Sequence, residues 1–122
     1  MDTLVIDIDN TITIDSDCDY SEKPVNTEVV EKMRRAKQLG YEIVLHTSRN
    51  MKTHRKDIAK INKNTLPVIL DWLDKHDIPY DGIVVGKPWC GKNGFYVDDK
   101  AIRPSEFINL SFSEINQLVG NE

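Results

Sequence analysis

LVIDIDNT, residues 4–11, joins a short apolar run to two carboxylates and a hydroxyl. The apolar part is typical of a buried strand, which we expect to span residues 3–9. Side chains alternate between the two faces of a strand, so Asp7 and Asp9 would lie on one face, with Thr11 just beyond. Two like charges at this spacing are costly unless a cation, a proton or a substrate offsets them. The stretch therefore predicts a strand that ends in a charged, functional site.

Length and composition predict a single soluble domain that spans residues 1–122. The content of 39% hydrophobic and 30% charged residues is ordinary for a globular protein. A net charge of −4 argues against nucleic acid or an anionic membrane as a partner. The start at Met1 lacks the basic segment of a signal peptide, and Cys18 and Cys90 are expected to be free thiols. We therefore expect a cytoplasmic protein and leave open a homo-oligomer.

Helical and strand patterns alternate along the rest of the chain. A 3.6-residue period predicts a helix that begins at Thr27 and stops at Gly40, and residues 12–25 read as a polar loop with room for a small hairpin. Further elements are predicted as strands over 41–45, 83–85 and 95–97, a helix over 66–76, and a last helix that opens with the capping box Ser111/Glu114. This alternation predicts an α/β fold with a mainly parallel sheet.

Polar side chains follow each of the four predicted strands. In chain order they are Asp7 and Asp9, Thr47 and Ser48, Lys87, and Asp98 and Asp99. Ligands of open α/β sheets bind outside the carboxyl ends of the strands, so we expect these four groups to meet at one site.

The chemistry of this set points to phosphoryl transfer. Carboxylates suit Mg²⁺, which takes one or two of them together with waters and substrate phosphate. A lysine and a hydroxyl suit the anion, and catalysis then consists mostly of positioning and charge neutralisation. On this interpretation Asp7 is the nucleophile that carries the phosphoryl group. Asp9 would protonate the leaving oxygen and then activate water.

The motifs Asp7-x-Asp9-x-Thr11, Thr47, Lys87-Pro88 and Asp98-Asp99 stand in the order of the four motifs of the haloacid dehalogenase superfamily, which the chain resembles over residues 3–110. More narrowly, HTSRNM (46–51) and YDGIVVGKPWCGKNGFYVDDKAIRPSEF (80–107) resemble small phosphatases associated with capsule polysaccharide biosynthesis.

This resemblance implies a Rossmann-like three-layer sandwich in which the first strand is central and the fourth lies beside it. It also implies a magnesium ion held by Asp7, by the main-chain carbonyl of Asp9 and by Asp98, with Asp99 in support. Thr47 and Lys87 would grip the phosphoryl oxygens.

The chain departs from the superfamily pattern in three respects. Asn10 stands where Gly is common, and Lys87 lies only 11 positions before Asp98, so this lysine is expected on a loop rather than on a full helix, with Lys92 as the alternative phosphate-binding lysine. The loop after Thr11 is too short for a cap domain, so we predict a capless enzyme. Its open cleft would be closed at most by residues 12–25, by residues 49–65 or by a neighbouring subunit.

Several polar residues near the predicted phosphate site are candidates for substrate binding: Thr11, Ser48, Arg49 and Asn50. Arg49 and Asn50 could contact the part of the substrate that is not transferred, or belong to a charged surface helix. Thr47 or Ser48 could instead cap a helix.

The sequence thus predicts a Mg²⁺-dependent phosphatase that acts through an aspartyl phosphate on a phosphorylated sugar or related small metabolite in polysaccharide biosynthesis. The alternatives are a phosphoacceptor domain similar to bacterial receivers, a phosphotransferase, and a non-catalytic phosphate-binding protein. Receivers place the paired acids before the phosphoacceptor strand, whereas here the adjacent pair, Asp98 and Asp99, comes last.

Overall fold

The computed structural model describes residues 2–121. The chain divides into two compact units, Met1–Trp89 and Cys90–Glu122. Met1 and Glu122, the ends of the predicted domain, lie outside the described residues, and the single domain over 1–122 stays a prediction. Among the residues described, no helix is both long and apolar enough to span a membrane.

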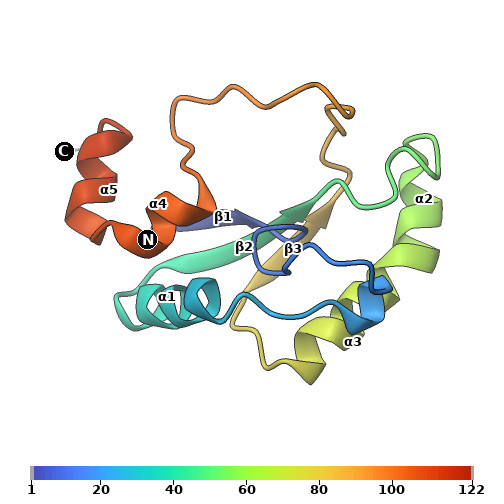
Figure 1. Cartoon of the computed structure of the whole chain (residues 1–122), viewed down its shortest axis with the longest axis horizontal. Helices are drawn as coiled ribbons and strands as arrows, with labels where there is room; N and C mark the ends of the chain where they lie inside the picture. Colours follow the sequence, from blue (N-terminus) through green and yellow to red (C-terminus); the bar gives the residue numbers. More distant parts are fainter. Residues whose placement is uncertain (1, 122) are drawn as a thin grey trace. The chain divides into compact units, whose positions relative to one another are not determined.

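The first unit is built on a sheet of three parallel strands (Figure 1). They are β1 (Thr3–Asp7), β2 (Glu42–Thr47) and β3 (Gly82–Val85), in the spatial order β1-β2-β3. The register pairs Asp7 with His46 and Thr47 with Val85, so all three strands end at one edge of the sheet. The predicted α/β class and parallel sheet are confirmed, whereas the three-layer sandwich stays a prediction.

Helix α1 (Thr27–Gln38) follows the predicted bounds closely. Its first turn is capped by Asn26, whose side-chain oxygen accepts a hydrogen bond from the Val29 amide at 3.4 Å. At its end Gly40 adopts φ +95°, a left-handed conformation that glycine takes without steric cost. The side chains that α1 buries are Val29, Val30, Met33 and Ala36, and those buried on β2 include Ile43 and Leu45. These side chains form the core on one face of the sheet.

The second helical segment is longer than the sequence predicts. It runs through α2 (Ile58–Lys60), the π-helical turn η2 (Ile61–Thr65) and α3 (Leu66–Lys75). The extra turns, IAKINKNT, carry lysines and asparagines among their apolar residues, and this stretch is too short and mixed to show the longer apolar period that identified residues 66–76. Helix α3 buries Ile69, Trp72 and Leu73 in the core.

Residues 12–25 form the small hairpin for which the sequence left room. Thr13 and Val25 pair as an antiparallel bridge, and the Ile14 amide donates to the Pro24 carbonyl at 2.9 Å. The short 3-10 turn η1 (Tyr20–Glu22) lies within this loop. The indole nitrogen of Trp72 donates to the Lys23 carbonyl at 2.9 Å, which ties the loop to α3.

The second unit corrects one sequence prediction. Residues 95–97 are not a strand, and Phe95 and Val97 are 80% and 88% exposed. Three apolar residues cannot form a strand from local pattern alone, because a strand requires a hydrogen-bonded neighbour. The unit does contain the predicted last helix, α5 (Phe112–Leu118), and a helix that the sequence analysis missed, α4 (Pro104–Asn109).

The capping box at the start of α5 forms as predicted. The Glu114 amide donates to Ser111 Oγ at 3.1 Å, and the Ser111 amide donates to Glu114 Oε1 at 2.9 Å. Signals for α4 are also present, since Pro104 occupies its first turn and the Arg103 amide donates to Glu106 Oε1 at 2.9 Å.

Candidate active site

The segment that carries the paired acids changes from strand to turn between them. Asp7 is the last residue of β1, which ends two residues earlier than predicted. The Ile8 carbonyl then accepts hydrogen bonds from the amides of Ile12 and Thr13, at 2.9 and 3.1 Å. Within this turn Asn10 adopts φ +61°. Asparagine tolerates the left-handed conformation better than most residues, which explains how it can stand where the superfamily commonly has Gly.

The side chains of Thr11 and Lys87 lie close to the carboxylate of Asp7. Thr11 Oγ1 donates to Asp7 Oδ2 at 3.2 Å, and Lys87 Nζ lies 3.7 Å from Asp7 Oδ1. Burial raises the pKa of the Asp7 carboxyl above its usual range, and the nearby charge of Lys87 opposes that rise. Thr11 was predicted to bind substrate. The contact that the structure shows for its side chain is the hydrogen bond to Asp7, the proposed nucleophile.

Lys87 follows β3, which is separated from β1 by β2, so its side chain reaches Asp7 across the end of the middle strand. Its backbone is fixed at the end of β2, where the Lys87 amide donates to the Thr47 carbonyl at 3.1 Å. The preceding Gly86 adopts φ +87°, and a Cβ placed there would lie 2.7 Å from Ile58 Cδ1. A residue with a side chain would be strained at this position, so Gly86 allows the turn that brings Lys87 to the site.

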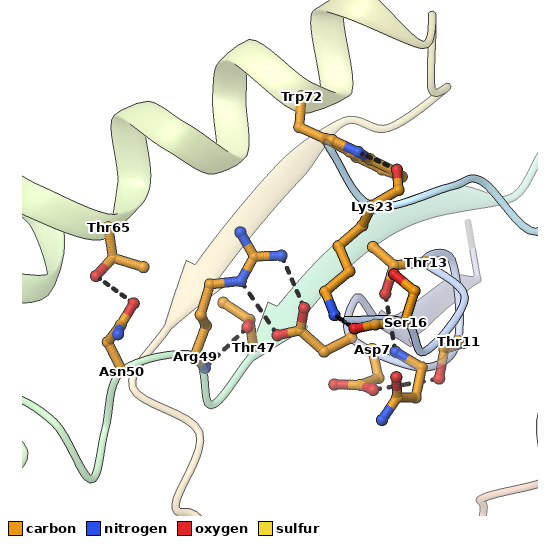
Figure 2. Close-up of polar contacts among 12 residues, drawn as sticks. Asp7, Thr11, Thr13, Ser16, Lys23, Thr47, Arg49, Asn50, Thr65 and Trp72 are labelled. Atoms are coloured by element: carbon orange, nitrogen blue, oxygen red, sulfur yellow. Dashed lines mark hydrogen bonds and ion pairs between the residues drawn. The ribbon is translucent and has the colours of Figure 1, made fainter. Parts of the chain in front are cut away.

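Asp9 has a different partner from Asp7. Arg49 forms a fork on its carboxylate, with Nη2 at 2.7 Å from Oδ1 and Nε at 3.2 Å from Oδ2 (Figure 2 shows the Arg49 end of this contact). The side chain of Arg49 is only 2% exposed and that of Asp9 is 30% exposed. The ring of Tyr20 lies against the guanidinium, with its centroid 4.1 Å from Cζ. Each acid of DIDNT thus has its own cation, which reduces the repulsion between them.

The end of β2 differs from the sequence prediction at Thr47 and His46. Thr47 is fully buried and shares a strand face with Ile43 and Leu45, and its Oγ1 accepts the Arg49 amide at 3.0 Å. His46 lies beside Asp7 in the register of the sheet. Burial, followed by the charge of Lys87, lowers the pKa of the His46 imidazole. This histidine was not predicted to be near the site.

Ser48 and Asn50, two predicted substrate-binding residues, begin the loop after β2. The Ser48 carbonyl accepts the Met51 amide at 3.0 Å. Asn50 adopts φ +62°, and its Oδ1 accepts a hydrogen bond from the buried Thr65 hydroxyl at 2.9 Å (Figure 2). The first contact lies within the loop and the second fixes the loop to the helical segment at Thr65, and substrate binding by the two residues stays a prediction.

The remaining candidates belong to the second unit: Lys92, Asp98 and Asp99. All three are exposed, and Asp98 Oδ1 accepts the Lys100 amide at 2.9 Å. The lysine that the first unit brings to Asp7 is Lys87; Lys92 stays the alternative for phosphate binding.

The oxygen ligands that the first unit offers suit part of the coordination shell of a magnesium ion. Within residues 2–121, no group of three or more His, Cys, Asp or Glu side chains could hold a metal ion. Asp7 offers one partly buried carboxylate, while both oxygens of Asp9 are engaged by Arg49. One or two carboxylates completed by waters and phosphate are what Mg²⁺ commonly takes, so Asp7 and a main-chain carbonyl fit that ion.

Sequence reasoning missed two features of this site. It did not find the contact of Tyr20 with Arg49, because nothing in a polar loop marks a single tyrosine as special. It assigned Arg49 to the substrate, whereas the partner that the structure shows is Asp9, 40 positions away. A buried fork of this kind depends on tertiary structure and leaves no local pattern.

The fold and site together define an α/β protein with polar side chains at the carboxyl ends of parallel strands. In structure the chain is similar to the crystal structure of a structural-genomics target protein from Vibrio cholerae, with a TM-score of 0.96 and 50% sequence identity over 98% of each chain. The chain therefore belongs to the same family as this Vibrio protein. No family model matches the sequence, and no curated protein matches it either.

Proposed function

We propose that this protein is a Mg²⁺-dependent phosphatase that forms an aspartyl phosphate on Asp7. The observation that carries the proposal is the separate pairing of the two acids. Asp7 lies beside Lys87, a cation suited to a transferred phosphoryl group, and Asp9 lies beside Arg49. Asp7 ends β1 and Asp9 follows it, at the strand end where α/β proteins bind ligands. The resemblance to the haloacid dehalogenase superfamily supports the same assignment.

The proposed reaction has two steps with two roles for Asp9. In the first, an Asp7 oxygen attacks phosphorus, the bond to the leaving oxygen breaks, and protonated Asp9 gives that oxygen its proton. In the second, Asp9 takes a proton from water, and the resulting hydroxide attacks phosphorus. The bond from phosphorus to Asp7 then breaks, its electron pair returns to the carboxylate, and inorganic phosphate is released.

In this proposal, Asp7, the carbonyl of Asp9, Asp98 and Asp99 would hold the magnesium ion. The ion would neutralise charge on the phosphoryl group. Lys87 would do the same from the protein side and at the same time oppose the rise in the pKa of Asp7 that burial causes. A phosphate-binding role for Thr47 would require its buried hydroxyl to become accessible, since its Oγ1 now accepts the Arg49 amide.

The proposed substrate is a phosphorylated sugar or a related small metabolite of polysaccharide biosynthesis, and the proposed location is the cytoplasm. This assignment rests on the resemblance of residues 46–51 and 80–107 to the capsule-associated phosphatases. A capless site with an open approach suits a substrate larger than the phosphate itself. Thr11, Ser48 and Asn50 are the proposed contacts to its remaining part.

A phosphate-release assay tests this proposal directly. Wild-type protein is incubated with a panel of sugar phosphates and nucleotides, with Mg²⁺ and with a chelator. We expect Mg²⁺-dependent release on at least one sugar phosphate and a loss of several orders of magnitude in Asp7→Asn. Glu31→Gln, a charge change on the exposed face of α1, serves as the matched control and should retain activity. Release that persists in Asp7→Asn would contradict the proposal.

A further inference from the structure

We propose that Arg49 is a positioning residue that fixes the carboxylate of Asp9 for proton transfer. This inference rests on the proposed phosphatase function and assigns one of its parts. Arg49 acts on the reaction through Asp9, and its fork decides which oxygen lone pairs of that carboxylate face the reacting groups.

The first ground for the inference is the geometry of the contact. Two different nitrogens of Arg49 reach two different oxygens of Asp9, at 2.7 and 3.2 Å. Such bidentate contacts fix the plane and direction of a carboxylate, whereas a single hydrogen bond leaves it free to rotate. A lysine in this position would supply charge without the fork.

The second ground is that Arg49 is itself held at both ends. Its amide donates to Thr47 Oγ1, so the backbone is attached to the buried end of β2. The ring of Tyr20 covers the guanidinium, and the whole residue is only 4% exposed. An arginine loses much side-chain freedom when it is fixed in this way, so it can hold Asp9 in one place at a small further cost in entropy. Surface ion pairs lack this property.

The third ground is chemical. Each carboxylate oxygen has two lone pairs, and the fork engages one on each oxygen of Asp9. The two that remain are the sites through which Asp9 can hold the proton that it passes to a leaving oxygen, or receive one from water. The fork therefore sets the direction of proton transfer in both steps. Misplacement of a catalytic group by about 1 Å can lower the rate about 100-fold.

The third nitrogen of the Arg49 guanidinium, Nη1, does not take part in the fork on Asp9. Arg49 Nη1 is buried and has no hydrogen-bond partner among the described residues. Binding of a substrate oxygen to Nη1, while Nε and Nη2 hold Asp9, would require this buried atom to become accessible. The earlier prediction that Arg49 contacts the substrate is thus compatible with positioning, and the two roles separate in kinetics: positioning affects kcat, and substrate contact affects KM.

A double-mutant cycle tests the inference. The phosphatase kinetics of wild type, Arg49→Lys, Asp9→Asn and the double variant are compared on the sugar phosphate that the panel identifies. We expect Arg49→Lys to lower kcat by ~10- to 100-fold, with KM changed by less than about threefold. In the Asp9→Asn background the same substitution should change kcat by less than about twofold, because asparagine cannot transfer a proton however it is positioned. Arg34→Lys is the matched control, because Arg34 forms an exposed ion pair with Glu31 on α1. Its kcat and KM should equal those of the wild type.

A second measurement tests the contact itself without an assay. Exchange of the Arg49 Nε proton with water, followed by NMR, should be slow in wild type and faster in Asp9→Asn. If Arg49→Lys fails to fold, Tyr20→Leu takes its place in the cycle, since it removes the ring that covers the guanidinium and leaves the fork chemically possible. Tyr20→Leu should lower kcat in wild type and have little effect in Asp9→Asn.

Two results would overturn the inference while leaving the phosphatase proposal intact. One is a loss from Arg49→Lys that is equally large in Asp9→Asn, and the other is a rise in KM with kcat unchanged. Wild-type protein that releases no phosphate from any substrate, with the slow Nε exchange still present, would instead reject the proposed function and the catalytic role built on it.

Discussion

Lys87 Nζ lies 3.7 Å from Asp7 Oδ1, although Asp7 ends β1, Lys87 follows β3, and these two strands are not neighbours in the sheet. The lysine reaches across the end of β2, where its own amide is bonded to the Thr47 carbonyl. This arrangement gives the Asp7 carboxylate a cation that comes from a separate part of the sequence.

Removal of the Lys87 charge should raise the pKa of Asp7 further. Burial already raises this pKa above the ordinary value of 3.8, and Lys87 is the largest of the opposing effects. In Lys87→Met the desolvated carboxylate loses its stabilising charge, so its titration should move to higher pH. The measurement is the pH dependence of the Asp7 carboxyl carbon resonance in metal-free protein. An unchanged or lower midpoint in the variant would contradict the assigned contact.

Asp7→Asn should stabilise the metal-free protein at neutral pH. A carboxyl whose folded pKa is raised binds its proton more tightly in the folded state, so stability falls as pH rises from 3.8 through the raised pKa. Asparagine removes the buried charge, and we expect Tm at neutral pH to rise by ~1–4 °C. Thermal unfolding checks this, and the gain should vanish in acid, where both proteins are uncharged at this position. A gain of equal size at both pH values would point to another cause.

Gly86→Ala should lower activity through a displaced Lys87. Alanine at φ +87° is strained, and its Cβ would approach Ile58 Cδ1 to 2.7 Å. We expect a loss of stability of ~1 kcal/mol and a fall in kcat/KM of ~10-fold or more, because the turn must open to relieve the strain. Gly120→Ala near the chain end, also at positive φ but with open space around it, separates backbone strain from the effect on Lys87. Equal activity of the two variants would contradict the proposed role of the turn.

Asp81 should stabilise the fold in a pH-dependent way away from the site. Its Oδ2 accepts the Ile43 amide at 2.7 Å and Lys37 Nζ at 2.6 Å, and the hydrogen bond from Ile43 is the main cause of its lowered pKa. A lowered folded pKa gives stability above the ordinary 3.8 that is lost as pH falls through the folded value. Asp81→Ala should therefore have a lower Tm than wild type at neutral pH. The difference should shrink in strong acid, and a difference independent of pH would contradict the assignment.

The parts of this structure that the sequence predicted are those with local causes. Helix α1 has an apolar period, a capping Asn26 and a terminal Gly40, all within a few residues of the elements they define. The capping box of α5 is local in the same sense. The three parallel strands were predicted from short apolar runs between such signals, with errors of one or two residues at their ends.

The parts that failed or were missed depend on contacts distant in sequence. Residues 95–97 have the apolar character of a strand but no strand geometry in the described chain. For the site, the sequence indicated which residue types gather at the strand ends but could not say which acid pairs with which cation. The assignment of Lys87 to Asp7 and of Arg49 to Asp9 required the register of the sheet and the path of two loops.

Identification of the phosphorylated residue tests the central claim most directly. With a substrate that has a good leaving group, Asp9→Asn should still form the aspartyl phosphate. The variant should hydrolyse it slowly, so the phosphoprotein should accumulate. Reduction of the acyl phosphate with borohydride, followed by peptide mass spectrometry, should convert Asp7 alone to homoserine. Phosphate release by the wild type with no trapped phosphoprotein in Asp9→Asn, or with the label on another residue, would contradict the account.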